Sequence, residues 1–189
     1  NAVVQRVPAR ETVAAQALSV APGHVVPMAS IISWLEHNGY NRSSTVREPG
    51  EYAVRGGILD LFPAGLDQPV RFDFFGDSLE SIRSFDAETQ RTLLPMRSLD
   101  LVPISEFQLV TETIRRFRMG YVATFGAPQR DDLLYEAVSE GRRHPGMEHW
   151  LPLFYERLDT MFDYLPDAPV VFDHLALESV GERHKLILD

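Results

Sequence analysis

The sequence predicts a mixed α/β (α+β) fold, in which a small antiparallel sheet with one covering helix precedes a second region of helices and strand. Three patterns support this class. Apolar residues have helical spacing near residue 30, alternate every second residue from 44 to 94, and return to helical spacing after 103. At 189 residues the chain is long enough to bury a core.

The first helix is expected in "PMASIISWLEHNGY", where Pro27 suits a helix start and Gly39 a helix end. The apolar positions between them follow the spacing i, i+3, i+4, i+7, which places on one helix face Met28, Ile31, Ile32 and Leu35. We expect this amphipathic helix to cover one face of the sheet that follows.

The alternating region from 44 to 94 is broken by the turn clusters "EPG", "PAGLDQP", "GD" and "DAETQ". This punctuation predicts a meander of short antiparallel strands. A domain boundary is expected near Pro103, followed by a helix that Thr111 could cap. Further elements are predicted at 130–140, closed by Gly141, at 170–172 as a strand, and beyond as a terminal helix.

The composition narrows the classes of protein. Hydrophobic residues make up 44% of the chain and charged residues 24%, as in ordinary globular domains. Cysteine is absent, which excludes disulfides and fits a reducing compartment, so we expect a cytoplasmic protein. No run of 18 apolar residues occurs, so no membrane span is expected. Because the chain begins at Asn1 without methionine, we expect a piece of a longer protein.

The charges argue against two kinds of site. Eighteen basic against 27 acidic residues give a net charge of −9, whereas a surface that neutralises phosphates should be basic. A P-loop needs lysine followed by Ser or Thr, and Lys185, the single lysine, is followed by Leu186. We therefore expect no bound nucleotide cofactor and no ATPase activity. "PVVFDH", 169–174, resembles a magnesium-holding strand end, but without that loop we interpret it as a core strand.

The stretch "PVRFDFFGD" raises a question about its two faces. In a strand, Val70, Phe72 and Phe74 form one apolar row, while Arg71, Asp73 and Phe75 share the other row. A large aromatic side chain thus lies among charges. Burying a Phe is worth about 1.5–3 kcal/mol, so this placement indicates either a covering loop or a covering partner.

The preceding strand adds to the same face. In "EYAVRGGILDLFP", Arg55 lies on the more polar side, and Gly56 and Gly57 allow a bulge or a close backbone approach. If the two strands pair, Arg55 joins Arg71, Asp73 and Phe75. A solvated Arg–Asp pair worth about 0–1 kcal/mol is the plainer interpretation, but it leaves the phenylalanine unexplained. Arginines around an aromatic residue are typical of an interface hot spot.

Three stretches carry a resemblance to a known family: "REPGEYAVRGGILDLFPAG", "VRFDFFGDSLESIRSFDAETQRT" and, more loosely, "GMEHWLPLFYE". They resemble the amino-terminal, UvrB-like region of the bacterial transcription-repair coupling factor, Mfd. The match is dense from 47 to 92 and looser on both sides. UvrB itself is the nearest alternative, but it would begin with a P-loop region.

The resemblance implies a nucleotide-binding-like domain, here without a P-loop, interrupted by a small domain that docks UvrA. Residues 1–14 would be the end of its first half, 15–103 would form the UvrA-docking domain, and 104–189 would form its second half. In the family, other regions of the full-length protein bind ATP and magnesium, and other regions also contact DNA and RNA polymerase. Those regions are not in this chain. For this chain the resemblance implies a non-enzymatic role, the recruitment of UvrA that links stalled RNA polymerase to nucleotide excision repair.

The family's docking residues fall on positions that the alternation already singled out. The arginine of its "VRG" strand corresponds to Arg55, and the arginine and second phenylalanine of its "RxDFF" strand correspond to Arg71 and Phe75. The acidic residue that takes part in UvrB-like docking corresponds to Asp73. The resemblance thus implies that Phe75 is covered by another protein.

Two other functions stay open from the residues alone. An arginine-dependent nucleic-acid-binding module could use the helix "TIRRFRMG", which carries Arg115, Arg116 and Arg118. A metal-dependent hydrolase could use His144 and His149, although their spacing of five residues gives no helical register for a shared metal.

Overall fold

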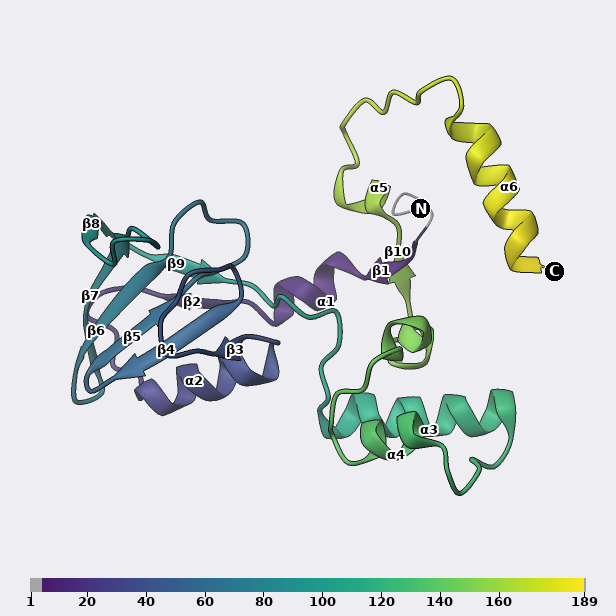
Figure 1. The fold of residues 1–189 in the computed structure, drawn as a ribbon, viewed down its shortest axis with the longest axis horizontal. Coiled ribbons are helices and arrows are strands. Elements are labelled where there is room, and N and C mark those ends of the chain that lie inside the picture. Colours follow the sequence, from purple (N-terminus) through teal and green to yellow (C-terminus); the bar gives the residue numbers. More distant parts are fainter. Residues whose placement is uncertain (1–4, 189) are drawn as a thin grey trace.

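A computed structural model describes residues 5–188 of the chain. It has a β-rich part, which contains a six-stranded sheet, and a mainly helical part (Figure 1). The β-rich part lies on the left of Figure 1 and is joined by α1 (Arg10–Ala15) and by the segment after β9 (Leu99–Leu101) to the helical part on the right. The mixed fold predicted from the sequence is confirmed.

The six-stranded sheet has the strand order β3-β4-β5-β6-β7-β8. Its strands are β3 (Asn41–Arg42), β4 (Glu51–Arg55), β5 (Ile58–Leu61), β6 (Val70–Phe75), β7 (Ser78–Phe85) and β8 (Thr92–Met96). Consecutive strands from β4 to β8 pair antiparallel, as the meander prediction required. The two-residue strand β3 departs from that prediction, because it pairs parallel to β4.

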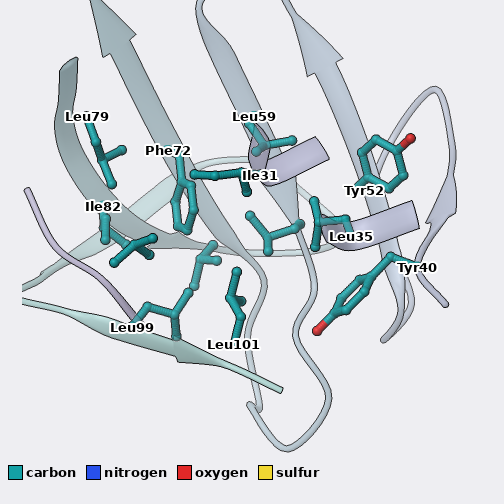
Figure 2. Close-up of a cluster of buried hydrophobic side chains, with 13 residues drawn as sticks. Ile31, Leu35, Tyr40, Tyr52, Leu59, Phe72, Leu79, Ile82, Leu99 and Leu101 are labelled. Carbon is teal, nitrogen blue, oxygen red and sulfur yellow. The ribbon is translucent and has the colours of Figure 1, made fainter. Parts of the chain in front are cut away.

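One face of this sheet is apolar, and most of it is covered. Helix α2 (Met28–His37) packs on it, together with a ribbon formed by β2 (Leu18–Val20) and β9. Figure 2 shows side chains from the sheet, from α2 and from β9 pointing towards one another in a single cluster. Its most buried members include Ile31, Leu35, Tyr52, Leu59 and Phe72, each with no exposed surface.

Helix α2 confirms the first prediction from spacing. Ile31 and Leu35 are buried, and Met28 and Ile32 pack partly buried against the same cluster. Gly39 follows the helix with a φ of +94°, and a Cβ at this position would lie 2.7 Å from the Cβ of Ser105. Both the backbone conformation and the close approach therefore favour glycine here.

The helical part is built from α3 (Thr111–Phe125), α4 (Leu133–Ser139) and a 3₁₀ helix over Met147–Leu153. They enclose a second, aromatic cluster that contains Phe107, Phe117 and Phe154. Phe117 stacks on Phe154 with ring centroids 4.9 Å apart. The chain then continues through β10 (Leu158–Asp159) and α5 (Met161–Tyr164) to α6 (Ala176–Leu188).

Two pairs of strands connect segments that are distant in sequence. Leu18–Val20 pairs with Leu99–Leu101, so the chain enters and leaves the β-rich part side by side. β1 (Val7–Pro8) pairs with β10, and the Tyr164 hydroxyl donates to the Pro8 carbonyl oxygen at 2.7 Å. The predicted boundaries at 14/15 and 103/104 stay predictions, and residues 1–4 and 189 of the outer segments lie outside the described residues.

Three predicted elements need correction. The strand expected at 170–172 is absent; Val170, Val171 and Phe172 lie in an irregular segment and are 49%, 91% and 49% exposed. Thr111 is the first residue of α3 and not its cap; the Thr113 hydroxyl accepts from the Val110 N–H at 3.2 Å instead.

The helix expected over 130–140 begins only at Leu133. Asp132 caps it by accepting a hydrogen bond from the Tyr135 N–H at 2.9 Å. Gly141 follows this helix with a φ of +76°, as expected for a residue that closes a helix. Along residues 5–188, no helix is both long enough and apolar enough to cross a bilayer.

Candidate partner-docking site

The second face of the six-stranded sheet carries the four residues that the sequence singled out. Arg55 lies at the end of β4, and Arg71, Asp73 and Phe75 alternate along β6. We call this the polar face and define it by these four residues together with Asp60 of β5 and Arg83 of β7. The face opposite, which carries Tyr52, Leu59 and Phe72, is the apolar face.

Alternation along β6 is preserved to its end. Val70 and Phe72 are buried and Phe74 packs partly buried against the core, whereas Phe75 is 82% exposed. The irregularity in the β6–β7 ladder lies in β7: Asp73 pairs with Ser81 and Phe74 with Leu79, so Glu80 is the extra residue. Because the bulge lies in β7 and not in β6, Phe75 stays on the same face as Arg71 and Asp73.

The end of β6 is fixed by its neighbours. Phe75 pairs with Ser78 across a two-residue turn in which Gly76 has a φ of +59°, a conformation that favours glycine. On the other side, the Phe74 N–H donates to the Gly57 carbonyl at 2.8 Å, and a Cβ on Gly57 would lie 2.8 Å from the Phe74 carbonyl oxygen. The close approach predicted for the Gly56–Gly57 pair is therefore present.

A buried carboxylate organises two of the arginines. Asp60, with no exposed surface, accepts from Arg55 Nη2 at 2.5 Å and from Arg71 Nε and Nη2 at 2.6 Å and 2.8 Å. The Arg71 guanidinium also lies 4.7 Å from the centre of the Phe85 ring, within the range of a cation–π contact. Hydrogen bonding to Asp60 raises the pKa of Arg71, so the guanidinium stays charged.

A second carboxylate holds the third arginine. Asp73 accepts from the Ser81 hydroxyl at 2.6 Å and from Arg83 Nη2. Burial by itself would raise the pKa of Asp73, but the hydrogen bonds from Ser81 and Arg83 outweigh it and hold this pKa below its usual value. Arg71 and Arg83 are direct cross-strand neighbours, a repulsive arrangement unless each has its own carboxylate, as here.

Exposure rises along the polar face from one end to the other. Arg71 is covered by a small cluster on this face that includes Phe62 and Phe85, and its side chain is only 15% exposed. The side chains of Arg83 and Arg55 are 41% and 50% exposed, and Phe75 is 82% exposed. A partner would therefore meet Phe75 and Arg55 first, whereas Arg71 mainly supports Asp60.

The structure thus brings the four predicted residues to one face and adds two that the sequence analysis missed. Asp60 could have been found by alternation, since it shares a strand face with Ile58 and lies opposite Arg71 once β5 and β6 are in register. Arg83 depends on the β6–β7 register, which the bulge at Glu80 shifts by one residue, so alternation alone could not place it.

The other candidate residues do not form a comparable site. Arg115 pairs with Glu112 at 2.8 Å, Arg116 pairs with Glu156 at 2.6 Å, and Arg118 Nε donates to the Tyr135 hydroxyl at 3.4 Å. These arginines lie on α3, which belongs to the helical part and lies apart from the six-stranded sheet in Figure 1.

His144 is half-buried and His149 is exposed, and His144 Nδ1 contacts the Pro145 carbonyl oxygen at 2.6 Å. Among residues 5–188, no group of three or more His, Cys, Asp and Glu side chains is placed to hold a metal ion.

Comparison with known proteins shows which family the chain resembles. A family described as "UvrB interaction domain" matches residues 18–107, the part that contains the polar face. The transcription-repair-coupling factor of Haemophilus influenzae is 45% identical over 150 residues, covering 79% of this chain and 13% of the relative. That of Escherichia coli is 36% identical over 184 residues, covering 97% of this chain and 16% of the relative.

A more distant relative covers the chain almost completely. The transcription-repair-coupling factor of Bacillus subtilis is 28% identical over 199 residues, which cover 98% of this chain. The chain spans between 13% and 17% of the length of these three relatives. Residues 18–107 match the UvrB interaction domain, and the chain belongs to the family of transcription-repair-coupling factors.

Proposed function

We propose that the polar face binds UvrA and that this chain is the UvrA-recruiting part of a transcription-repair-coupling factor. The observation that carries the proposal is Phe75, which is 82% exposed at the last position of β6, on the same face of the sheet as the half-exposed side chain of Arg55. Exposed aromatic and arginine side chains on an ordered surface are the residue types that dominate binding energies at interfaces.

The charges of the polar face fit a protein partner better than a nucleic acid. Three arginines face two aspartates, so most of the positive charge is already neutralised within the face. Arg55 uses one of its five donor N–H groups on Asp60 and keeps the others available for a partner acceptor. A nearly neutral face with one apolar anchor is suited to a specific protein contact.

The remaining family roles belong to the longer protein. We place the ATP- and magnesium-dependent motor, and the contacts with RNA polymerase and DNA, in regions outside this chain, and we assign this chain no catalytic step. The cytoplasmic location expected from the cysteine-free sequence stays a prediction.

Calorimetric titration of purified UvrA with the 189-residue chain tests the proposal. Phe75→Ala and Arg55→Ala should each weaken binding about thirtyfold, equivalent to about 2 kcal/mol, if they are central anchors. Leu94→Ala is the matched control, because Leu94 is 70% exposed and alternates with Pro95, which pairs with Arg83 of the polar face. Leu94 therefore lies on the opposite side of the sheet, and its truncation should leave affinity unchanged.

Arg71→Ala should also weaken binding, but it has to be assessed together with an unfolding curve, since it removes a partner of buried Asp60. Unchanged affinity in both the Phe75 and the Arg55 variants, each folded by circular dichroism, would contradict the proposal.

A further inference from the structure

The segment before α2 extends the polar face with a second apolar side chain. Gly23 to Val26 runs antiparallel to the start of β7 and is held by three backbone hydrogen bonds. The Gly23 N–H donates to Leu79 O at 2.7 Å, the Val26 N–H to Asp77 O at 2.7 Å, and the Leu79 N–H to His24 O at 3.0 Å. This segment therefore runs beside the start of β7 and is joined to it by an antiparallel β-bridge between Val25 and Ser78.

The register of this segment places Val25 on the same face as Phe75. Val25 lies opposite Ser78, and Ser78 lies opposite Phe75, so the three residues form one cross-strand row. Residues directly opposite one another in a ladder share a face. Alternation agrees, because the next residue, Val26, packs partly buried against the core beneath the sheet.

Val25 is 81% exposed and Phe75 is 82% exposed, the two highest values among the large hydrophobic side chains of residues 18–107. A single exposed valine on a protein surface needs no explanation. Here the two most exposed apolar side chains of the domain lie in one row. Two strand spacings separate their backbones by about 9.5 Å. Polar or charged exposed residues border them, namely His24, Asp77 and Glu80.

We propose that Val25 is a second apolar anchor for UvrA, so that the partner presents one continuous apolar surface that covers Val25, Ser78 and Phe75. This inference rests on the proposed function and deepens it. Apolar residues at the centre of an interface with polar residues at its rim are the usual anatomy of a protein–protein contact. The sequence analysis missed Val25 because it precedes α2 and only the bridge to Ser78 places it beside Phe75.

Surface binding assays with immobilised UvrA and four variants of the 189-residue chain test the inference. Val25→Asp should weaken binding at least tenfold, whereas Val25→Ile, which keeps an apolar side chain, should stay within about twofold of the unsubstituted chain. Leu94→Asp is the matched control, since it adds the same charge to another well-exposed apolar position, 70% exposed, on the other side of the sheet. Phe75→Ala reports on the proposed function itself.

The outcomes separate the two ideas. Val25→Asp within twofold of the unsubstituted chain, while Phe75→Ala loses binding, overturns the anchor and leaves the proposed function standing. Equal losses of affinity for Val25→Asp and Leu94→Asp also overturn it, because the added negative charge would then weaken binding wherever it lies on the sheet. An unsubstituted chain that does not bind UvrA contradicts both. Thermal unfolding midpoints should be unchanged in both aspartate variants, since neither side chain is buried.

Discussion

The two faces of the six-stranded sheet are built from the same strands, yet they differ in what covers them. The apolar face is covered by α2 and by the β2–β9 ribbon, and its defining side chains, Tyr52, Leu59 and Phe72, have no exposed surface. The polar face is covered at one end only, by the cluster around Phe62 and Phe85, and is open at Phe75. Alternate residues of β6 therefore serve stability and recognition separately.

The largest expected difference between the two faces is in folding stability, and truncation of Phe72 should reveal it. Phe72→Ala should lower the free energy of unfolding by about 3–5 kcal/mol, because it leaves a cavity in a fully buried site. Phe75→Ala should change it by less than about 0.5 kcal/mol, as expected for an exposed side chain. Phe74→Ala should fall between them, since Phe74 is only partly buried.

Urea unfolding curves of the three variants measure these differences. The separation of the two faces would be wrong if Phe75→Ala lost more stability than Phe72→Ala.

The second expected effect is the loss of stability when the buried Asp60 carboxylate beneath the polar face is removed. Asp60→Asn keeps the shape of the side chain but removes the carboxylate that accepts from Arg55 and Arg71. Removing one partner of a buried pair typically costs about 3–5 kcal/mol, and we expect the lower end, because Arg55 is half exposed and can turn to solvent. UvrA binding should weaken as well, since both arginines lose their support.

Asp67→Asn is the control for this substitution, as Asp67 is an exposed aspartate in the loop between β5 and β6. Thermal unfolding that is equally unaffected in both variants would show that Asp60 does not hold the arginines in place.

The smallest effect is a pH dependence of the polar face. The pKa of Asp73 is lower in the folded chain than its usual value, so its ionised form stabilises the fold above the unfolded pKa of about 3.9, and that contribution is lost as the pH falls through the folded pKa. Asp73→Asn should therefore be less stable than the unsubstituted chain at pH 7, by less than about 1 kcal/mol. The difference should shrink to zero in acid.

Urea midpoints of both proteins, measured from pH 7 to pH 3, follow this change. A stability difference that stays constant over the whole range would contradict the assignment to the Asp73 carboxylate.

The sequence predicted the elements whose signals are local. Apolar spacing located α2, and two-residue alternation placed Phe72 inside and Phe75 outside. The sequence could not predict which residues join a face when that depends on pairing with another strand. Asp60 and Arg83 join the polar face through cross-strand register, and Val25 through its bridge to Ser78.

The same limit explains the wrong strand at 170–172. The apolar run "VVF" between Pro169 and Asp173 has the composition of a buried strand, but a strand also needs a neighbour with which to exchange backbone hydrogen bonds. In the part of the chain that the structure describes, this run pairs with no other strand. The composition of a segment indicates that it favours a strand, but it does not show whether a second strand is available to pair with it.

The two-residue turn after Phe75 has a consequence for the speed and entropy of recognition. Because Phe75 is the last residue of β6 and Gly76–Asp77 returns the chain directly into β7, folding has already fixed the backbone that carries the ring. A partner then needs to immobilise only side-chain rotamers, at about 0.5–1.5 kcal/mol each, and not a loop. Such a preorganised surface associates without a preceding conformational step, so loss of the ring should act mainly by shortening the lifetime of the complex.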